Sequence, residues 1–373
     1  MGDSNNDVRA PFRADHVGSF LRPAELRSAM ERAASGGIDD AELKALQDKA
    51  IRDVVAMQES VGLGVATDGE FRHASFHHFL EKVDGVAAGR PDAHAGVAKK
   101  PFEPRSYAVV GKLRHSRPIE VDAFQFLKGI TRQTPKVTMV SPTMLLRAGR
   151  KDVNAEIYSD LGQFYADIPA VFQAEIAQLG AAGCKYIQLD DTNYAYLCDP
   201  EFRSRRQLGG ADFQELSMRY AGLINASIAG RPAGMRVGIH ICRGNSGGSF
   251  AAQGGYEPVA DTLLNALDVD GYFLEYDDER SGGFEPLRFF PKNSHKRIVL
   301  GIVSTKRPEL EAKDDLKRRI DAAAKFVPLE NLCISPQCGF ASTYKGNPVS
   351  EDIQRRKLEL VVETAREVWG SAR

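Results

Sequence analysis

The chain has 373 residues, of which 43% are hydrophobic and 27% are charged. This size and composition provide a full core in one large domain or two ordinary ones, and exclude wholesale disorder. The 49 Lys and Arg residues nearly balance the 50 Asp and Glu residues, so no overall field favours a nucleic acid or an anionic membrane. No apolar run approaches the roughly 20 residues that span a bilayer, and the N-terminal segment has no signal-peptide pattern. We therefore expect a soluble, cytoplasmic protein.

Eight short runs rich in β-branched residues predict strands at residues 15–20, 65–69, 136–142, 186–191, 236–242, 271–276, 297–303 and 332–338. Amphipathic segments between them predict helices that include residues 40–61, 167–182, 213–228 and 310–326. Helices alternating with continuous apolar strands indicate a parallel sheet covered on both faces. Eight such strands favour an α/β fold of the (β/α)8 TIM-barrel type. No Gly-x-Gly-x-x-Gly follows the first strand, which disfavours a dinucleotide-binding fold.

One long segment, residues 71–135, does not follow this alternation. It is rich in His, Pro, Arg and Gly, and a hairpin is expected near residues 107–121. We interpret the segment as an excursion from the barrel after the second strand. Residues 1–373 then form a single barrel domain, with a disordered tail at residues 1–10. Because the excursion leaves the C-terminal end of a strand, we expect it over the active-site face.

Four residues at predicted strand ends have the side chains of a metal site. His240 and Cys242 are two apart on the fifth strand and project from the same face. Glu275 and Cys338 lie at later strand ends on the same rim, so the four could complete a tetrahedron around zinc. A single His-x-Cys on a strand is more often packing than ligation, because cysteine is among the most buried residues. The additional Cys and Glu favour the metal site.

The charge of this ligand set indicates a type of chemistry. Zinc contributes +2, and two thiolates with one carboxylate contribute −3, which leaves −1. Such an electron-rich ion is a poor Lewis acid for making hydroxide from water. It is suited to keeping another thiol deprotonated and nucleophilic. The set therefore favours alkylation of a thiol over hydrolysis.

Several segments, in order along nearly the whole chain, resemble the cobalamin-independent methionine synthase family. This family belongs to the barrel superfamily that includes uroporphyrinogen decarboxylase, and the likeness is to its short, single-barrel members. The segments are His16-Val-Gly-Ser19, Thr67-Asp-Gly-Glu70, Ser141-Pro-Thr-Met144, Gln188-Leu-Asp-Asp191, His240-Ile-Cys242, Glu275 and Gln337-Cys-Gly339.

The resemblance implies roles for particular residues. Zinc would be held by His240, Cys242, Glu275 and Cys338. An amino-acid thiol would be held by Gly18 and Ser19, and Glu70 and Asp190 would grip its ammonium group. Two neighbouring carboxylates are costly unless a cation lies between them, which agrees with this role. Alternatively, Asp190 could cap the following helix, and Ser19 could simply end a strand.

Two departures concern the methyl donor. The long enzymes of the family stack an aromatic residue on the pterin of a folate, and residues 144–147 here contain no aromatic. Their proton-donating His is replaced by Lys306, which we take as a candidate catalytic residue. Lysine, with an ordinary pKa near 10.4, is a weak acid at neutral pH. We therefore do not assume methyltetrahydrofolate. Arg243 and Asn245, beside the ligands, are candidates for holding a substrate carboxylate.

The leading hypothesis is a zinc-dependent S-methyltransferase that methylates homocysteine to give methionine. The partners would be a small-molecule thiol and a methyl donor, and the oligomeric state stays open, with a homodimer compatible. One alternative is a related zinc-dependent enzyme that opens an epoxide or transfers another alkyl group to a coenzyme-M-like thiol. Two others are a cofactor-free decarboxylase and a non-catalytic protein that binds a thiol or methionine.

Overall fold

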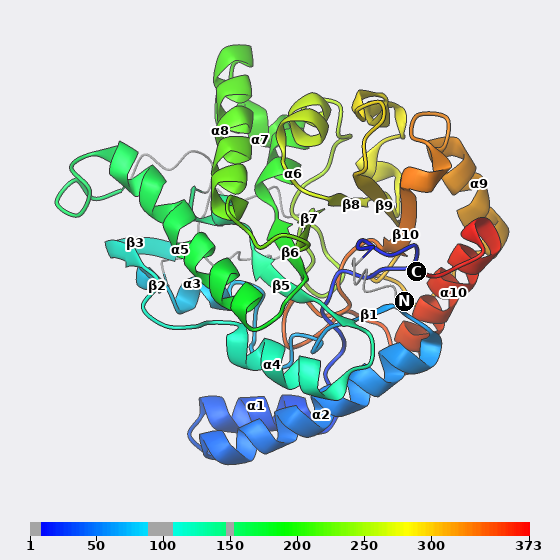
Figure 1. Ribbon diagram of the computed structural model, residues 1–373, viewed down its shortest axis with the longest axis horizontal. Coiled ribbons are helices and arrows are strands. Elements are labelled where there is room, and N and C mark those ends of the chain that lie inside the picture. Colours follow the sequence, from blue (N-terminus) through cyan, green and yellow to red (C-terminus); the bar gives the residue numbers. More distant parts are fainter. Residues whose placement is uncertain (1–8, 89–106, 147–152) are drawn as a thin grey trace, which may run out of the picture.

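The computed structural model describes residues 9–88, 107–146 and 153–373, and a ring of parallel strands occupies its centre (Figure 1). Six strands form one parallel sheet in the order β10-β9-β8-β7-β6-β5. They are β5 (Val137–Val140), β6 (Tyr186–Asp191), β7 (Arg236–Ile241), β8 (Gly271–Glu275), β9 (Arg297–Val303) and β10 (Leu332–Pro336). A parallel pair joins β1 (Val65–Ala66) to β4 (Thr134–Pro135), and β4 leads into β5 after a single residue. Strand order thus follows chain order, as successive βα units require.

The first strand position closes the ring. On one side Ala14 bridges in parallel to Ile334 of β10. On the other side the Phe20 amide donates to the Gly69 carbonyl at 3.2 Å. The predicted (β/α)8 TIM barrel is thereby confirmed. The predicted strand at residues 15–20 is wrong in detail, because this segment is extended but irregular, and its glycine has a φ of 132° that no regular strand adopts.

Helices cover the outside of the ring (Figure 1). They are α1 (Ala24–Ala34), α2 (Asp40–Val61), α3 (His78–Glu81), α4 (Val121–Ile130), α5 (Leu161–Ala181), α6 (Asn193–Cys198), α7 (Pro200–Arg205), α8 (Gly210–Ile228), α9 (Lys313–Ala323) and α10 (Glu351–Trp369). Short 3-10 or π turns are η1 (Pro142–Leu146), η2 (Thr262–Ala266), η3 (Glu279–Ser281), η4 (Glu285–Phe289) and η5 (Leu329–Asn331). The last helix, α10, packs beside α2, so the outer layer closes near the start of the chain. None of the described helices is both long and apolar enough to cross a membrane.

Local signals account for where the helices begin and end. The bounds of α2 match the prediction because Asp39 caps its first turn by accepting from the Glu42 amide at 2.8 Å, and Gly62 ends it at a φ of 94°. Helix α5 begins before the predicted residue 167, because Asp160 caps it through the Gly162 amide. The predicted helices at residues 213–228 and 310–326 correspond to α8 and α9 within three residues.

The excursion after β1 contains α3 and a two-stranded antiparallel sheet before α4 returns to the barrel. Strand β2 (Asp84–Ala88) pairs with β3 (Tyr107–Arg114). The predicted hairpin at residues 107–121 is therefore wrong, because only its first half is a strand and α4 begins at Val121. Residues 89–106, between the two strands, lie outside the described residues, as do residues 1–8 of the expected tail. Ala10, also assigned to that tail, is buried.

The barrel interior contains a buried polar network beneath the site. The Lys136 side chain is fully buried, and its Nζ donates to Asp15 Oδ1 at 2.8 Å and to Gln188 Oε1 at 3.1 Å. The Gln188 amide nitrogen in turn donates to Asp190 Oδ1 at 2.8 Å. A buried charge is tolerated only when it is paired and hydrogen-bonded, and this lysine is both. The network orients Asp190 from below.

Candidate active site

The four predicted metal ligands come together at the C-terminal end of the barrel. One donor atom from each of His240, Cys242, Glu275 and Cys338 lies within 4.8 Å of the others, and all four residues are buried. His240 is on β7 and Cys242 directly follows it, Glu275 ends β8, and Cys338 follows β10. Parallel strands end on the same rim, which is why residues almost a hundred positions apart meet here.

The spacing of these atoms fits a tetrahedral metal ion. The Cys242 and Cys338 sulfurs lie 3.6 Å apart, and both thiols are free. Two sulfurs each bound at about 2.3 Å to one tetrahedral ion lie about 3.8 Å apart. The other ring nitrogen of His240, Nδ1, is 3.3 Å from the Phe273 carbonyl, while Nε2 is buried without a hydrogen-bond partner among the described residues. This is the usual arrangement of a ligating histidine, which is oriented through its second nitrogen.

The sulfur environment also favours a thiolate. The Cys242 thiol hydrogen-bonds to Cys338 and lowers the pKa of the Cys338 thiol well below its usual range, with further help from His240 and Lys306 and against the effect of burial. Metal ligation requires a deprotonated sulfur. The same contact raises the pKa of the Cys242 thiol well above its usual range, so it favours a thiolate at Cys338 alone. The residues present fit a zinc ion by donor type and spacing.

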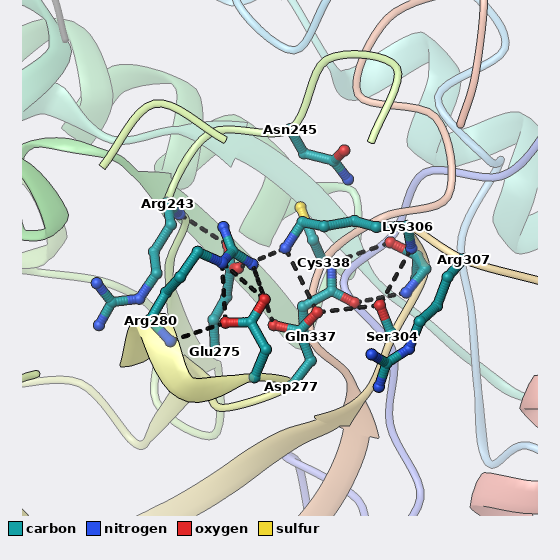
Figure 2. Close-up of polar contacts among 12 residues, drawn as sticks. Arg243, Asn245, Glu275, Asp277, Arg280, Ser304, Lys306, Arg307, Gln337 and Cys338 are labelled. Atoms are coloured by element: carbon teal, nitrogen blue, oxygen red, sulfur yellow. Dashed lines mark hydrogen bonds and ion pairs between the residues drawn. The ribbon is translucent and has the colours of Figure 1, made fainter. Parts of the chain in front are cut away.

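Glu275 is held by two donors besides its neighbours in the ligand set (Figure 2). The Arg243 amide donates to its Oε1 at 2.7 Å, and Lys306 Nζ lies 3.1 Å from its Oε2. The same ammonium group is 3.6 Å from Asp277 Oδ2. Burial alone lowers the pKa of Lys306, but the two carboxylates outweigh it and raise that pKa above its ordinary value. Lys306 is therefore a charged partner of Glu275 at neutral pH.

A cavity of about 260 Å³ opens beside the ligand cluster. The metal-ligand side of its lining is formed by His240, Cys242 and Cys338, and another part contains Ser19, Glu70 and Asp190. Three aromatic side chains, Phe76, Tyr196 and Tyr344, also line the cavity. Three of the four predicted ligands and three of the four predicted substrate residues thus line one space, and Glu275 and Gly18 are not among its lining residues.

Glu70 and Asp190 form a buried acidic pair in this cavity. Their exposed fractions are 4% and 7%, and neither forms an ion pair with a described residue. Burial, reinforced by Asp190, raises the pKa of Glu70 well above its usual range, and burial raises the pKa of Asp190 to about 6. Glu70 also adopts a φ of 62°, an uncommon backbone conformation for a non-glycine residue. Such a pair is poised to bind a cation.

The Gly18–Ser19 turn brings the first barrel segment close to this pair. A Cβ at Gly18 would lie 2.5 Å from the Thr138 methyl carbon and 3.5 Å from Glu70 Oε1. Thr138 donates to that same Glu70 oxygen at 3.2 Å. Gly18 therefore permits a close approach, and Ser19 lines the cavity directly. Gly18 itself is not among the residues that line the cavity.

Arg243, a candidate for holding a substrate carboxylate, does not line the cavity. Its side chain is fully buried, packs on the Tyr256 ring at 4.5 Å and turns away from Lys306 and Cys338 (Figure 2). Asn245 does line the cavity, and its amide nitrogen donates to the Gly339 carbonyl at 3.1 Å. The direction of a side chain after a strand end depends on the local turn, which the sequence did not reveal.

The aromatic part of the lining was missed by sequence reasoning. Phe76 and Tyr344 come from loops that meet through the hydrogen bond from the Tyr344 amide to the Ala74 carbonyl, at 3.1 Å. Tyr196 comes from α6. The available signal was the richness in His of the segment that begins at residue 71, since His77 lines the same cavity.

Comparison with known proteins agrees with this geometry. Residues 12–367 match the family model for the catalytic domain of cobalamin-independent synthase. The chain is 42% identical over 363 residues to "Uncharacterized protein YxjH" of Bacillus subtilis, which covers 97% of this chain and 96% of that protein. It is 26% identical over 325 residues to methionine synthase of Pyrococcus abyssi, and the match covers 87% of this chain and 84% of that protein.

A solved structure extends the likeness to three dimensions. The putative vitamin-B12-independent methionine synthase of Listeria monocytogenes superposes with a TM-score of 0.77 at 35% identity, over 97% of this chain and 99% of that one. The sequence match and the barrel point to the same conclusion. The chain belongs to the cobalamin-independent methionine synthase family, and residues 12–367 match its catalytic domain.

Proposed function

We propose that the protein is a zinc-dependent S-methyltransferase that converts homocysteine to methionine. One observation carries this proposal: a metal-type cluster of two cysteines, a histidine and a glutamate lies beside the same cavity as two buried carboxylates that form no ion pair with a described residue. The first feature suits a thiol and the second suits an ammonium group. Homocysteine contains both. Membership in the family supports the same acceptor.

The residues of the cavity divide the work by chemistry. His240, Cys242, Glu275 and Cys338 would hold zinc, which when bound supplies the positive charge that keeps a thiol deprotonated at neutral pH. Glu70 and Asp190 bind the substrate ammonium, whose positive charge offsets the unfavourable effect of burial on the two carboxylates. Ser19, which lines the same cavity, orients the substrate carboxylate. The aromatic side chains exclude water around the reacting sulfur.

The transfer itself is a displacement at the methyl carbon. The thiol proton is lost to solvent, the sulfur forms a bond to the methyl carbon, and the bond between that carbon and the donor breaks. The protein's contribution is to align the two reactants, which is worth many powers of ten in rate when the geometry is right. The donor is a separate molecule whose class the cavity does not specify.

The acidic pair separates this proposal from its nearest alternative. A coenzyme-M-like thiol ends in a sulfonate, which Glu70 and Asp190 would repel because both are buried and close together. A thiol amino acid presents a cation to the same place. We therefore favour homocysteine over a sulfonated thiol. Competition between homocysteine and 2-mercaptoethanesulfonate for the zinc-loaded protein distinguishes them.

The decisive experiment measures metal and activity together. Zinc content is determined by mass spectrometry, and methylation of homocysteine is assayed over a panel of methyl donors. Cys338→Ala is expected to lose zinc and activity together, because it removes one of two thiolate ligands. Cys333→Ala, which removes another buried thiol from the same strand region, is the matched control and should keep both. Full activity in protein free of metal would refute the proposal.

A further inference from the structure

The ion pair between Lys306 and Glu275 is unusual for its burial. The Lys306 side chain is 9% exposed, the Glu275 side chain is 0% exposed, and 3.1 Å separates Nζ from Oε2. Surface ion pairs contribute little, whereas breaking a buried one leaves an uncompensated charge at a large cost. Loss of Lys306 would therefore leave the Glu275 carboxylate without its cationic side-chain partner.

Lys306 is anchored independently of Glu275. Its ammonium lies 3.6 Å from Asp277 Oδ2, and the Ser304 hydroxyl donates to that same oxygen at 3.0 Å. Arg280 also pairs with Asp277, at 3.6 Å from the other carboxylate oxygen. Figure 2 shows the Lys306 ammonium and the Asp277 carboxylate lying between Glu275 and Ser304. The lysine thus keeps its place whether or not the Glu275 carboxylate moves.

Glu275 meets a conflict if it is both a metal ligand and fully buried. If a substrate sulfur were to take the place of its oxygen in the ligand set, the carboxylate would be left where water cannot solvate it. The Arg243 amide contacts Oε1, but a single backbone donor does not neutralise a charge. Lys306, already in contact with Oε2, does.

We propose that Lys306 is a positioning residue that gives the Glu275 carboxylate a permanent second partner, so that the substrate sulfur can replace it without leaving a buried unpaired charge. The charges balance: one thiolate replaces one carboxylate in the ligand set, and the carboxylate stays paired with one ammonium. The thiol proton leaves to solvent. This inference rests on the proposed function, and it assigns Lys306 a task different from that of a proton donor.

The test compares three variants of the full-length, zinc-loaded protein with the unchanged protein. Lys306→Met removes the charge, and Lys306→Arg keeps it. Arg307→Met is the matched control, because it removes a cation from the adjacent position, where the side chain is 52% exposed. Zinc affinity is measured by chelator competition, homocysteine affinity by calorimetry, and the sulfur neighbours of zinc by X-ray absorption.

Lys306→Met is expected to keep zinc, to bind homocysteine on the order of 100-fold more weakly, and to gain no sulfur neighbour when homocysteine is added. Lys306→Arg should retain most of the affinity, and Arg307→Met should match the unchanged protein. If Lys306→Met does not fold, Lys306→Gln provides the same measurements with a neutral hydrogen-bond donor.

Two results would overturn the inference. One is a Lys306→Met protein that binds homocysteine and gains a sulfur neighbour as the unchanged protein does. The other is a variant that loses zinc itself, which would make Lys306 part of the support of the metal site. An unchanged protein that holds no zinc would instead refute the proposed function, so the two failures are distinguishable.

Discussion

Replacing Asp190 by Asn should make the protein more stable and a poorer binder of its substrate. Asp190 is 7% exposed, and burial raises its pKa from 3.8 to about 6. Because the folded-state pKa lies above the unfolded value, the folded state holds the proton more tightly. Stability therefore falls as the pH rises from about 4 to about 6, and it stays lower above that range. At pH 7.5 the charge costs about 3 kcal/mol, and at pH 5 about half of that.

Asn keeps the shape of Asp and still accepts the hydrogen bond from Gln188, at 2.8 Å in the unchanged protein. The variant should thus gain up to about 3 kcal/mol at pH 7.5, and less at pH 5. Binding of methionine, whose ammonium loses one of its two carboxylate partners, should weaken by at least about tenfold. Urea unfolding at both pH values, at equal zinc loading, measures the first effect, and calorimetry measures the second.

The control for Asp190→Asn is Asp53→Asn, on the exposed face of α2, which should change stability by less than about 0.5 kcal/mol at either pH. A less stable Asp190→Asn protein at pH 7.5 would refute the reasoning. So would a stability difference that is the same at pH 5 and pH 7.5, because the effect would then not come from the charge.

Two further substitutions test the support of the site by urea unfolding. Lys136→Met should destabilise the protein by about 3–5 kcal/mol, because it leaves Asp15 buried without its cation; a loss below about 1 kcal/mol would show that the interior network is not needed. Gly18→Ala should cost about 2 kcal/mol or more, since its φ of 132° and the Thr138 methyl at 2.5 Å both oppose a Cβ. Gly222 is at an exposed position of α8, and nothing lies within 4 Å of an added Cβ there, so Gly222→Ala should instead stabilise the protein by about 0.5–1 kcal/mol. Equal effects at both glycines would contradict the steric argument.

Much of the site could be predicted because strand geometry is local. Side chains two apart on a strand point to the same face, so His240 on β7 and Cys242 directly after it project together. Parallel strands end on one rim of the barrel, which brings Glu275 and Cys338 to the same place. The bounds of α2 were predictable for a similar reason, since Asp39 and Gly62 cap it within the segment itself. The ligand set and the barrel thus follow from short-range patterns repeated along the chain.

Pairings between distant segments were not predictable in this way. The hairpin at residues 107–121 was wrong because β3 pairs with an upstream strand, and nothing in the local pattern distinguishes one partner from another. The direction of Arg243 depended on the turn that follows β7, where the side chain packs on Tyr256.

By itself, the sequence determined the type of the fold and the four candidate ligands, because these rest on residue type and strand period, whereas Glu70 and Asp190 were singled out by the resemblance to the family. The tertiary structure alone decided that Lys306 faces Glu275 and that neither Glu70 nor Asp190 forms an ion pair with a described residue. It also decided that aromatic side chains from separate loops line the cavity beside the ligands. The physical reason is that charge and burial depend on what surrounds a side chain, and those surroundings are assembled from segments far apart in the chain.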